Sequence, residues 1–446
     1  MLGYYLRLAL LSFRRNPGLT ALMVVAIGVG IGVCVVSLTV FHTMSGNPIW
    51  WKSDRLFAVT MDSWDANIPA DPERPQLPPD QLTYRDATYL HRSGIPQRSV
   101  IMYRSGGVVS VPGGADPRPR PATARVTTRD FFAMFEVPFK YGGTWNTAAD
   151  ESLEPVIVLT DPMNQKLFGG ENSVGRTLRW NDREFRVIGV TAPWEARPRY
   201  YDLNNGHFDP PEDVFIPWGA AIALDLDSAG STNCWKSEDL STREAFLNSE
   251  CVWIQMWVEL PDAESRARMQ SYMDAYWAQQ RAGGRFPRPR NNRLTNVDQW
   301  LVDQRVVSND NRVLVGLAFA FLAVCLINTV GLLLAKFLNA APIAGIRRAL
   351  GASRRALFAQ HFIEVGVVAA AGALLGLGLG ALGLYAVRIL YTSENPNRAG
   401  YEALGHFDVV SILWAAALAV IAAVAAGLYP AWRIGRVEPA VYLKNQ

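Results

Sequence analysis

A short basic segment has the residue types that suit docking against another protein. It consists of Gly345, Ile346, Arg347, Arg348, Ala349, Leu350, Gly351 and Ala352. Two adjacent arginines beside an apolar face can dock in a groove of a partner. The two glycines would bound a short helix. The alternative is ordinary positive charge beside a membrane, with no partner involved.

Two of the four cysteines could form a cross-link. Cys234 and Cys251 both fall in the long polar stretch 44–310. An oxidising compartment would favour a disulfide that closes the loop between them. Two free thiols are the alternative, because sequence alone carries no geometry. Cys34 and Cys325 lie in apolar stretches, where a thiol acts as a small apolar group.

The sequence contains no motif for catalysis, nucleotide binding or metal binding. The phosphate loop G-x-x-x-x-G-K-[ST] is absent, and so are H-E-x-x-H, paired C-x-x-C and G-x-S-x-G. We therefore expect no catalytic residue, metal or cofactor in this chain. Glu364, near the start of an apolar stretch, could be functional, but we expect it to reach water.

Four apolar stretches are long enough to cross a bilayer, which takes about 20 residues. They cover residues 19–41, 313–338, 365–390 and 410–429. The first is uncharged, is too long for a signal peptide and lacks a following A-x-A site, so we expect an uncleaved anchor.

These stretches divide the chain into nine expected segments. An amphipathic helix, 1–16, precedes the transmembrane helices, and a large domain, 44–310, is inserted between the first two. The transmembrane helices are predicted at 17–43, 311–338, 362–390 and 409–430. The remaining segments are a cytoplasmic coupling segment, a short loop and a tail, at 339–361, 391–408 and 431–446.

The distribution of charge predicts the orientation. Basic residues gather before the first span, between the second and third, and after the fourth, so the positive-inside rule places these segments and both termini in the cytoplasm. Residues 44–310 contain 29 Lys and Arg against 35 Asp and Glu, whereas the rest of the chain contains 14 against 5. An acidic outer domain argues against nucleic acid as a partner.

The inserted domain reads as mixed α/β with short strands and frequent turns, and we expect two subdomains. Apolar runs on either side of Gly106-Gly107 predict a hairpin, and those flanking Asn181-Asp182 predict another. Residues 294–312 predict a helix that continues into the second span without a break. Such a helix could carry motion across the membrane.

Small residues one helical turn apart predict close packing of helices in the membrane. They are Gly28 and Gly32 in the first span and Gly372, Gly376 and Gly380 in the third. The alternative is the general glycine enrichment of transmembrane helices. Asn328 is the main polar group deep in the second span, and it bonds either across a helix interface or to a local group.

Several runs resemble one protein family. Residues 126–137, VTTRDFFAMFEV, are similar to the x-T-x-x-F-F signature of MacB-type periplasmic core domains. Residues 166–178, KLFGGENSVGRTL, are similar to that family's L-F-G-G-x-x-P-V-G-x-x-L run, with Ser173 replacing the proline. Residues 345–353 resemble its E-I-G-I-R-x-A-L-G-A motif, and residues 429–443 resemble its closing P-A-x-x-A-x-x-x-P-x-x-A-L.

The resemblance identifies the chain as a MacB-like or FtsX-like ABC transporter permease of type VII, without a fused ATPase domain. It implies four transmembrane helices and a large mixed α/β periplasmic domain inserted between helices 1 and 2. In such bacterial inner-membrane proteins the segment corresponding to 345–352 sits on an ABC ATPase dimer. The ATPase, a separate polypeptide here, would bind ATP and Mg.

The resemblance also implies dimerisation and mechanotransmission, in which ATP-driven motion reaches the periplasmic domain. Ile343 replaces the Glu that usually opens the motif, so the second permease copy could be a different, paralogous one. The expected function is efflux or secretion together with a membrane-fusion protein and an outer-membrane channel. A lipoprotein-releasing permease and an FtsX-like regulator of an envelope hydrolase remain alternatives.

Overall fold

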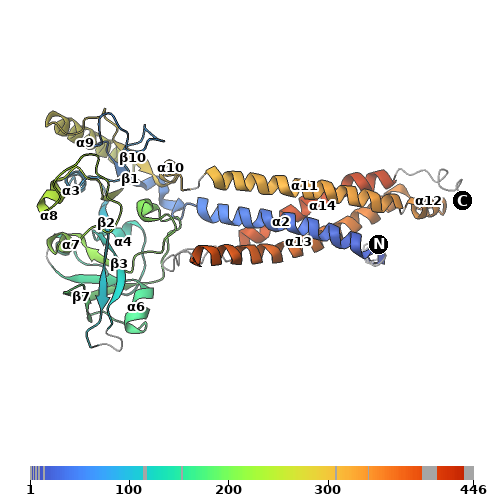
Figure 1. Ribbon diagram of the computed structural model, residues 1–446, viewed down its shortest axis with the longest axis horizontal. Coiled ribbons are helices and arrows are strands. Elements are labelled where there is room, and N and C mark those ends of the chain that lie inside the picture. Colours follow the sequence, from blue (N-terminus) through green and yellow to red (C-terminus); the bar gives the residue numbers. More distant parts are fainter. Residues whose placement is uncertain are drawn as a thin grey trace. The chain divides into compact units, whose positions relative to one another are not determined.

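The computed structural model separates the chain into a helix unit and an inserted unit. The helix unit comprises Met1–Ser45 and Val307–Gln446, and the inserted unit comprises Gly46–Val306, compared with the predicted 44–310 (Figure 1). The structure describes residues 3, 5, 8, 11–13, 16–113, 118–151, 154–306, 309–339, 341–393 and 409–435.

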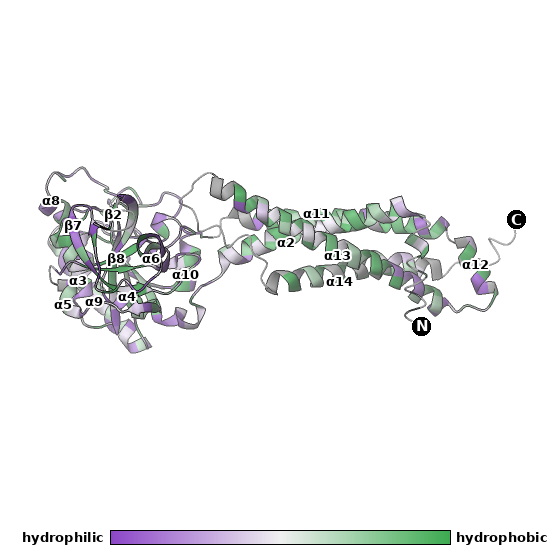
Figure 2. Ribbon diagram, turned by 90° about the horizontal axis from the view of Figure 1, so that it is seen from below, coloured by the Kyte–Doolittle hydropathy of each residue, from purple (hydrophilic) through white to green (hydrophobic). Residues whose placement is uncertain are grey.

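Four long helices make up most of the helix unit. They are α2 (Pro17–Ser45), α11 (Asn309–Asn339), α13 (Arg354–Ser393) and α14 (Val409–Gly435). Each contains a stretch that is long and apolar enough to cross a membrane, and apolar residues predominate along all four in Figure 2. α13 begins inside the predicted coupling segment 339–361, because the hydroxyl of Ser353 accepts a hydrogen bond from the Ala356 amide and caps the helix there.

The helices pack around α2, which contacts α11, α13 and α14. Burial of apolar side chains between the helices gives the unit its core. These side chains include Met23, Ile27, Ile31, Val35, Leu322, Leu333, Val365, Val368 and Leu418. A fifth helix, α12 (Ala341–Ala349), connects α11 with the segment before α13.

Some predicted segments fall partly outside the described residues. Within the predicted amphipathic helix 1–16, the described positions 3, 5, 8 and 11–13 are helical. Residues 394–408 of the predicted loop and 436–446 of the predicted tail lie outside the described part of the chain.

The strands of the inserted unit form one ten-stranded sheet, in the order β10-β1-β9-β2-β3-β8-β5-β7-β4, with β6 pairing to both β2 and β7. The pairs β3–β8 and β5–β7 are parallel, and the others are antiparallel. The strands are β1 (Leu56–Thr60), β2 (Arg98–Ser110), β3 (Arg120–Thr127), β4 (Phe139–Gly142), β5 (Val156–Leu159), β6 (Thr177–Trp180), β7 (Arg183–Thr191), β8 (Val214–Pro217), β9 (Gln255–Glu259) and β10 (Arg293–Asn296). A boundary between the two predicted subdomains would therefore cross a continuous sheet.

Helices surround this sheet and complete the core. They are α3 (Tyr84–His91), α4 (Asp130–Met134), α5 (Thr147–Glu151), α6 (Asp161–Phe168), α7 (Trp218–Ala223), α8 (Arg243–Asn248), α9 (Ala263–Ala282) and α10 (Val297–Asp303), with short 3-10 helices η1 (Trp50–Arg55) and η2 (Tyr200–Asn205). Mixed α/β content was predicted, and the structure confirms it.

One of the two predicted hairpins is wrong. The run around Gly106-Gly107 is a single strand, β2, and both glycines pair with β3 (Figure 1). A Cβ at Gly107 would lie 2.5 Å from Cε2 of Trp180. Glycine at this position therefore leaves room for the Trp180 ring within the strand and does not mark a turn. The hairpin at Asn181-Asp182 is present between β6 and β7, where Asn181 has a φ of 53°.

The predicted continuous helix over 294–312 is also wrong. Residues 293–296 instead form the edge strand β10, which pairs with β1. α10 ends at Asp303, and Arg305 has a φ of 49°, which stops helical propagation. α11 starts only at Asn309.

A disulfide joins Cys234 to Cys251, which are separated by 17 positions in the sequence. Cys251 is fully buried, and the bond ties the polar segment before α8 to the hydrophobic core of the inserted unit. Cys34 and Cys325 are free and buried in the helix unit.

Candidate coupling site

α12 holds most of the docking motif, but with different bounds from those predicted. The helix begins at Ala341-Pro342, and a proline is tolerated in the first turn because the amide that it lacks would have no helical partner there. Gly345 is buried inside α12 and does not bound it. Gly351 does follow the helix end, and its φ of 100° suits glycine best.

α12 presents an exposed apolar face. Ile343, Ile346 and Leu350 lie three and four positions apart, so they share one side of a helix. Their exposed fractions are 44%, 48% and 83%. Leu350 also continues the last turn, since its amide donates to the Ile346 carbonyl at 3.0 Å. Exposed apolar side chains gathered on one face are typical of a surface that another molecule covers.

The two arginines of the motif lie differently. Arg347 is half-buried and donates from Nη1 to Oε1 of Gln360 on α13 at 2.8 Å. This bond connects α12 to α13 directly. Arg348 is also half-buried. The backbone amide of Ala352 donates to the Arg347 carbonyl at 3.0 Å and helps to close the segment.

A buried polar cluster lies beside α12. Lys336 Nζ on α11 is 2.6 Å from Oε1 of Glu364 on α13, and both side chains are only 4% exposed. Nδ1 of His361 is 3.4 Å from the other carboxylate oxygen. Ser12 donates to Oε1 at 2.6 Å, so the N-terminal segment joins the cluster. Ion pairing and hydrogen bonding together offset the cost of removing the Glu364 charge from water.

The expectation that Glu364 reaches water is therefore wrong. No feature near Glu364 in the sequence indicated its partner, because Lys336 lies 28 positions away on the preceding span. One signal was available. Lys336 and Glu364 are charged residues in otherwise apolar runs, and they lie on either side of the short segment between the second and third spans. Such charges usually pair when both lie inside a membrane protein.

The predicted packing glycines meet at the contact between α2 and α13. A Cβ at Gly376 would be 2.9 Å from the Gly28 carbonyl oxygen, and one at Gly32 would be 3.1 Å from the Gly376 carbonyl oxygen. A Cβ at Gly372 would be 2.7 Å from the Ile27 side chain, and Gly380 is buried next to Gly32. The two backbones thus approach closely where side chains are absent.

Asn328 lies apart from these contacts. It is exposed on α11, and its amide makes no hydrogen bond within the described residues. The structure of one chain therefore shows neither of the two arrangements that we considered for this residue.

Four charged side chains are buried together in the inserted unit. Arg125 on β3 pairs with Asp202 and Glu212, and Arg199 lies 3.4 Å from Asp202 and 3.2 Å from Glu212. Burial opposes ionisation, but the two arginines hold the pKa of Asp202 and of Glu212 below the usual range. The group joins the start of η2, strand β3 and the segment before β8, so it ties three parts of the inserted unit together.

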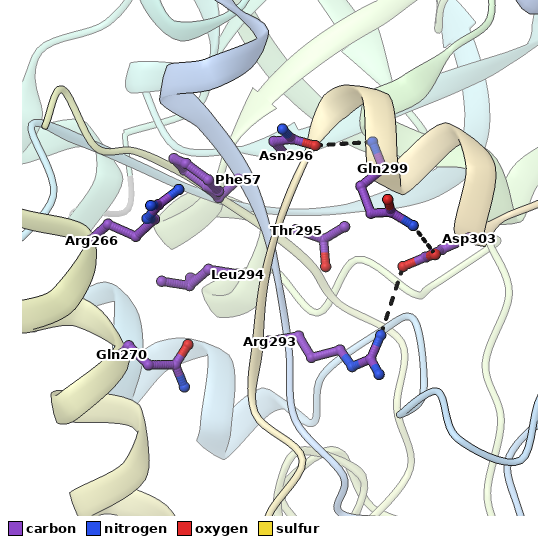
Figure 3. Close-up of a pocket in the computed structure, with 9 residues that line it drawn as sticks. All are labelled: Phe57, Arg266, Gln270, Arg293, Leu294, Thr295, Asn296, Gln299 and Asp303. Carbon is purple, nitrogen blue, oxygen red and sulfur yellow. Dashed lines mark hydrogen bonds and ion pairs between the residues drawn. The ribbon is translucent and has the colours of Figure 1, made fainter. Parts of the chain in front are cut away.

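A shallow pocket of about 490 Å³ lies along the edge strand β10, between α9 and α10. Figure 3 shows the Gln299 amide pointing to Asp303, and Arg293 approaching the same carboxylate from β10. Asp303 binds both neighbours, so the side chains of Gln299, Asp303 and Arg293 are occupied by one another.

Four apolar helices with an α/β unit between the first and second define a multi-span membrane protein of permease type. The chain belongs to the family with a MacB-like periplasmic core domain, whose model matches residues 20–276. The model for the FtsX-like permease C-terminal region matches residues 315–439. These matches confirm the predicted family and fold class.

The chain is similar over most of its length to two ATP-binding/permease proteins. It is 23% identical over 448 residues to the macrolide export protein MacB of Azoarcus sp., covering 99% of this chain and 59% of that protein. It is 23% identical over 437 residues to the pyoverdine export protein PvdT of Pseudomonas syringae pv. tomato, covering 96% and 57%. The chain thus spans less than two thirds of these relatives.

A shorter match and one solved structure complete the comparison. An uncharacterized ABC transporter permease protein of Mycobacterium tuberculosis is 36% identical over 115 residues, which cover 26% of this chain and 13% of that protein. The periplasmic region of MacB from Actinobacillus actinomycetemcomitans aligns with a TM-score of 0.37 and 15% identity, over 58% of this chain and 96% of that one.

Proposed function

We propose that this chain is the transmembrane permease subunit of an ABC-type efflux or secretion system. In this proposal it couples ATP hydrolysis by a separate ATPase to movement of its inserted domain. The exposed apolar face of α12 carries the proposal, because Ile343, Ile346 and Leu350 lie on a short segment between two spans. A partner that covers this face would be linked to α13 through the bond between Arg347 and Gln360.

The proposed partner at α12 is an ABC ATPase dimer, which binds ATP and Mg. The relatives named above are ATP-binding/permease proteins, which supports an ATPase as partner. The same names specify export, which supports efflux. A periplasmic membrane-fusion protein and an outer-membrane channel would complete the route outward.

The proposed location is the bacterial inner membrane, with both termini and α12 in the cytoplasm and the inserted unit in the periplasm. The basic residues near α12 support this orientation. A second permease copy would complete the assembly. Because Ile343 occupies the position of the family's usual acid, we propose a different, paralogous permease for this second place.

The test introduces a charge on the exposed face. Leu350→Asp should reduce the amount of copurified ATPase by about tenfold or more, since a buried charge at an interface costs several kcal/mol. The matched control is Leu240→Asp, which changes an exposed leucine of the inserted unit. Equal ATPase recovery with Leu350→Asp and the unchanged chain would contradict coupling through α12.

A further inference from the structure

The helix unit contains a cavity beside the buried polar cluster. Its volume is about 450 Å³, and it is bordered by the N-terminal segment, the end of α11, α12 and the first turns of α13. The proposed ATPase docking uses the exposed face of α12 and assigns no occupant to this cavity, which shares only Ile343 with that face. Its chemistry therefore calls for a separate explanation.

The cavity has an excess of positive charge. Lys336 and Arg347 line it, and Glu364 is the one acidic residue among the described lining side chains. Glu364 is already held by Lys336 at 2.6 Å, by Ser12 at 2.6 Å and by His361 at 3.4 Å. The carboxylate is thus neutralised from within, and the Arg347 charge has no acidic partner in this group.

Further hydrogen-bond donors surround this charge. A guanidinium carries five N–H donors, and the bond to Gln360 uses one of those on Arg347. The amides of Asn16 and Asn339 also line the cavity. A charged guanidinium with several amide donors is the arrangement that binds a phosphate group.

The remaining walls of the cavity are apolar. Leu8, Leu11, Phe337 and Leu357 line it next to the polar groups. Free phosphate would make no apolar contact with these side chains, whereas the glycerol backbone and upper acyl chains of a lipid would pack against them. Lys336 lies three positions before the end of α11, so the cavity occurs where an apolar span gives way to polar sequence. Lipid phosphates lie at this level, and basic pockets between membrane helices bind anionic headgroups.

We propose that this cavity binds the phosphate group of an anionic phospholipid, with Arg347 as its main contact. The lipid would join the N-terminal segment to α11, α12 and α13. Its presence would therefore change the mobility of α12 relative to the two spans that flank it.

The test measures lipid binding to the full chain without any ATPase. Delipidated protein in detergent is titrated with phosphatidylglycerol or with phosphatidylcholine of the same acyl chains, and native mass spectrometry counts the bound lipids. We expect one tight phosphatidylglycerol and at least tenfold weaker phosphatidylcholine. Arg347→Gln should weaken phosphatidylglycerol about tenfold, since it removes a charge-assisted bond.

The control is Arg354→Gln, which removes an exposed arginine of the first turn of α13 that does not line the cavity. It should leave the affinity unchanged. Ile343→Trp, which fills the cavity without changing charge, should weaken binding as much as Arg347→Gln. Gel filtration verifies that each variant is folded.

Three results would overturn the proposal. The first is equal binding of the two lipids, and the second is an equal loss of binding in Arg354→Gln. The third is displacement of phosphatidylglycerol by inorganic phosphate at equal concentration, which would make the site a simple phosphate site. None of these outcomes depends on ATPase docking, so the lipid site can fail while the proposed function stands.

Discussion

At the residue scale, Lys336 and Glu364 form a buried ion pair in the helix unit. It joins α11 to α13 at 2.6 Å, and both side chains are 4% exposed. A buried pair of this kind contributes little net stability, but the loss of one member leaves an uncompensated charge. The cost of breaking the pair is therefore larger than the gain from having it.

Lys336→Met should lower the free energy of unfolding by about 3–5 kcal/mol, because Glu364 would lose its cationic partner in a buried site. The double variant Lys336→Met with Glu364→Gln removes both charges and should recover at least half of that loss. Thermal unfolding of the chain in detergent measures both. Equal losses in the single and double variants would show that the two side chains do not act as a pair.

A second titratable residue gives the inserted unit a dependence on pH. Burial raises the pKa of Asp150 from its ordinary value to about 6, although Trp145 Nε1 and the Arg129 amide both donate to its carboxylate. The folded chain then holds the proton more tightly than the unfolded chain. Asp150 therefore stabilises the fold at low pH, and this contribution disappears as the pH rises through about 6.

Between pH 4 and pH 7, the free energy of unfolding should fall by about 2–3 kcal/mol more in the unchanged chain than in Asp150→Asn. The variant cannot titrate at this position, so the difference isolates one carboxyl group. Tryptophan fluorescence follows the inserted unit, which contains 12 of the 14 tryptophans. Parallel pH profiles for the two proteins would contradict the raised pKa.

At the scale of elements, the contact between α2 and α13 depends on missing side chains. Gly376→Val should push the two backbones apart, because its Cβ would lie 2.9 Å from the Gly28 carbonyl oxygen. We expect a loss of about 2 kcal/mol or more in stability, typical of overpacking. The control is Gly378→Val on the same helix, where no atom lies within 4 Å of the added Cβ. Similar losses at both positions would point to helix propensity instead of packing.

The same glycines show which elements the sequence could predict. Four apolar runs predict four spans, because length and composition alone decide whether a helix can cross a bilayer. A glycine pair is less informative. Gly106-Gly107 suggested a turn, yet the pair lies within a strand because Trp180, 73 positions beyond Gly107, occupies the space above it. Only the folded chain brings that tryptophan near.

The candidate site, like the fold, was predictable only where local sequence decides the structure. The motif 345–352 predicted a short helix that overlaps α12, because charge and spacing are local properties, but α12 begins before Gly345. The bond from Arg347 to Gln360 was not predictable, and neither were the contacts of Glu364 with Lys336 and Ser12, because in each case the partners come from different segments. The helix over 294–312 failed for a comparable reason, since pairing of β10 with β1 overrides its helical pattern.

At the scale of the whole molecule, the departure at Ile343 leads to a prediction about assembly. Ile343 is 44% exposed on α12, where the family's usual acid would add a charge. We expect the purified complex to contain one copy of this chain and one paralogous permease that keeps the acid. Quantitative mass spectrometry of the intact complex gives the ratio. Two copies of this chain with no second permease would refute the prediction.

The first and last strands of the inserted unit are neighbours, and this pairing has an evolutionary consequence. β1 and β10 pair from Phe57–Asn296 to Thr60–Arg293, and Asp298 binds both Asn47 and Ser53 at 2.7 Å. The points where the chain enters and leaves the unit are thus held side by side. A domain with adjacent ends can be exchanged as a cassette without stretching its host. Recombination could therefore enlarge, shrink or replace the inserted unit of such a protein while its helix unit is inherited intact.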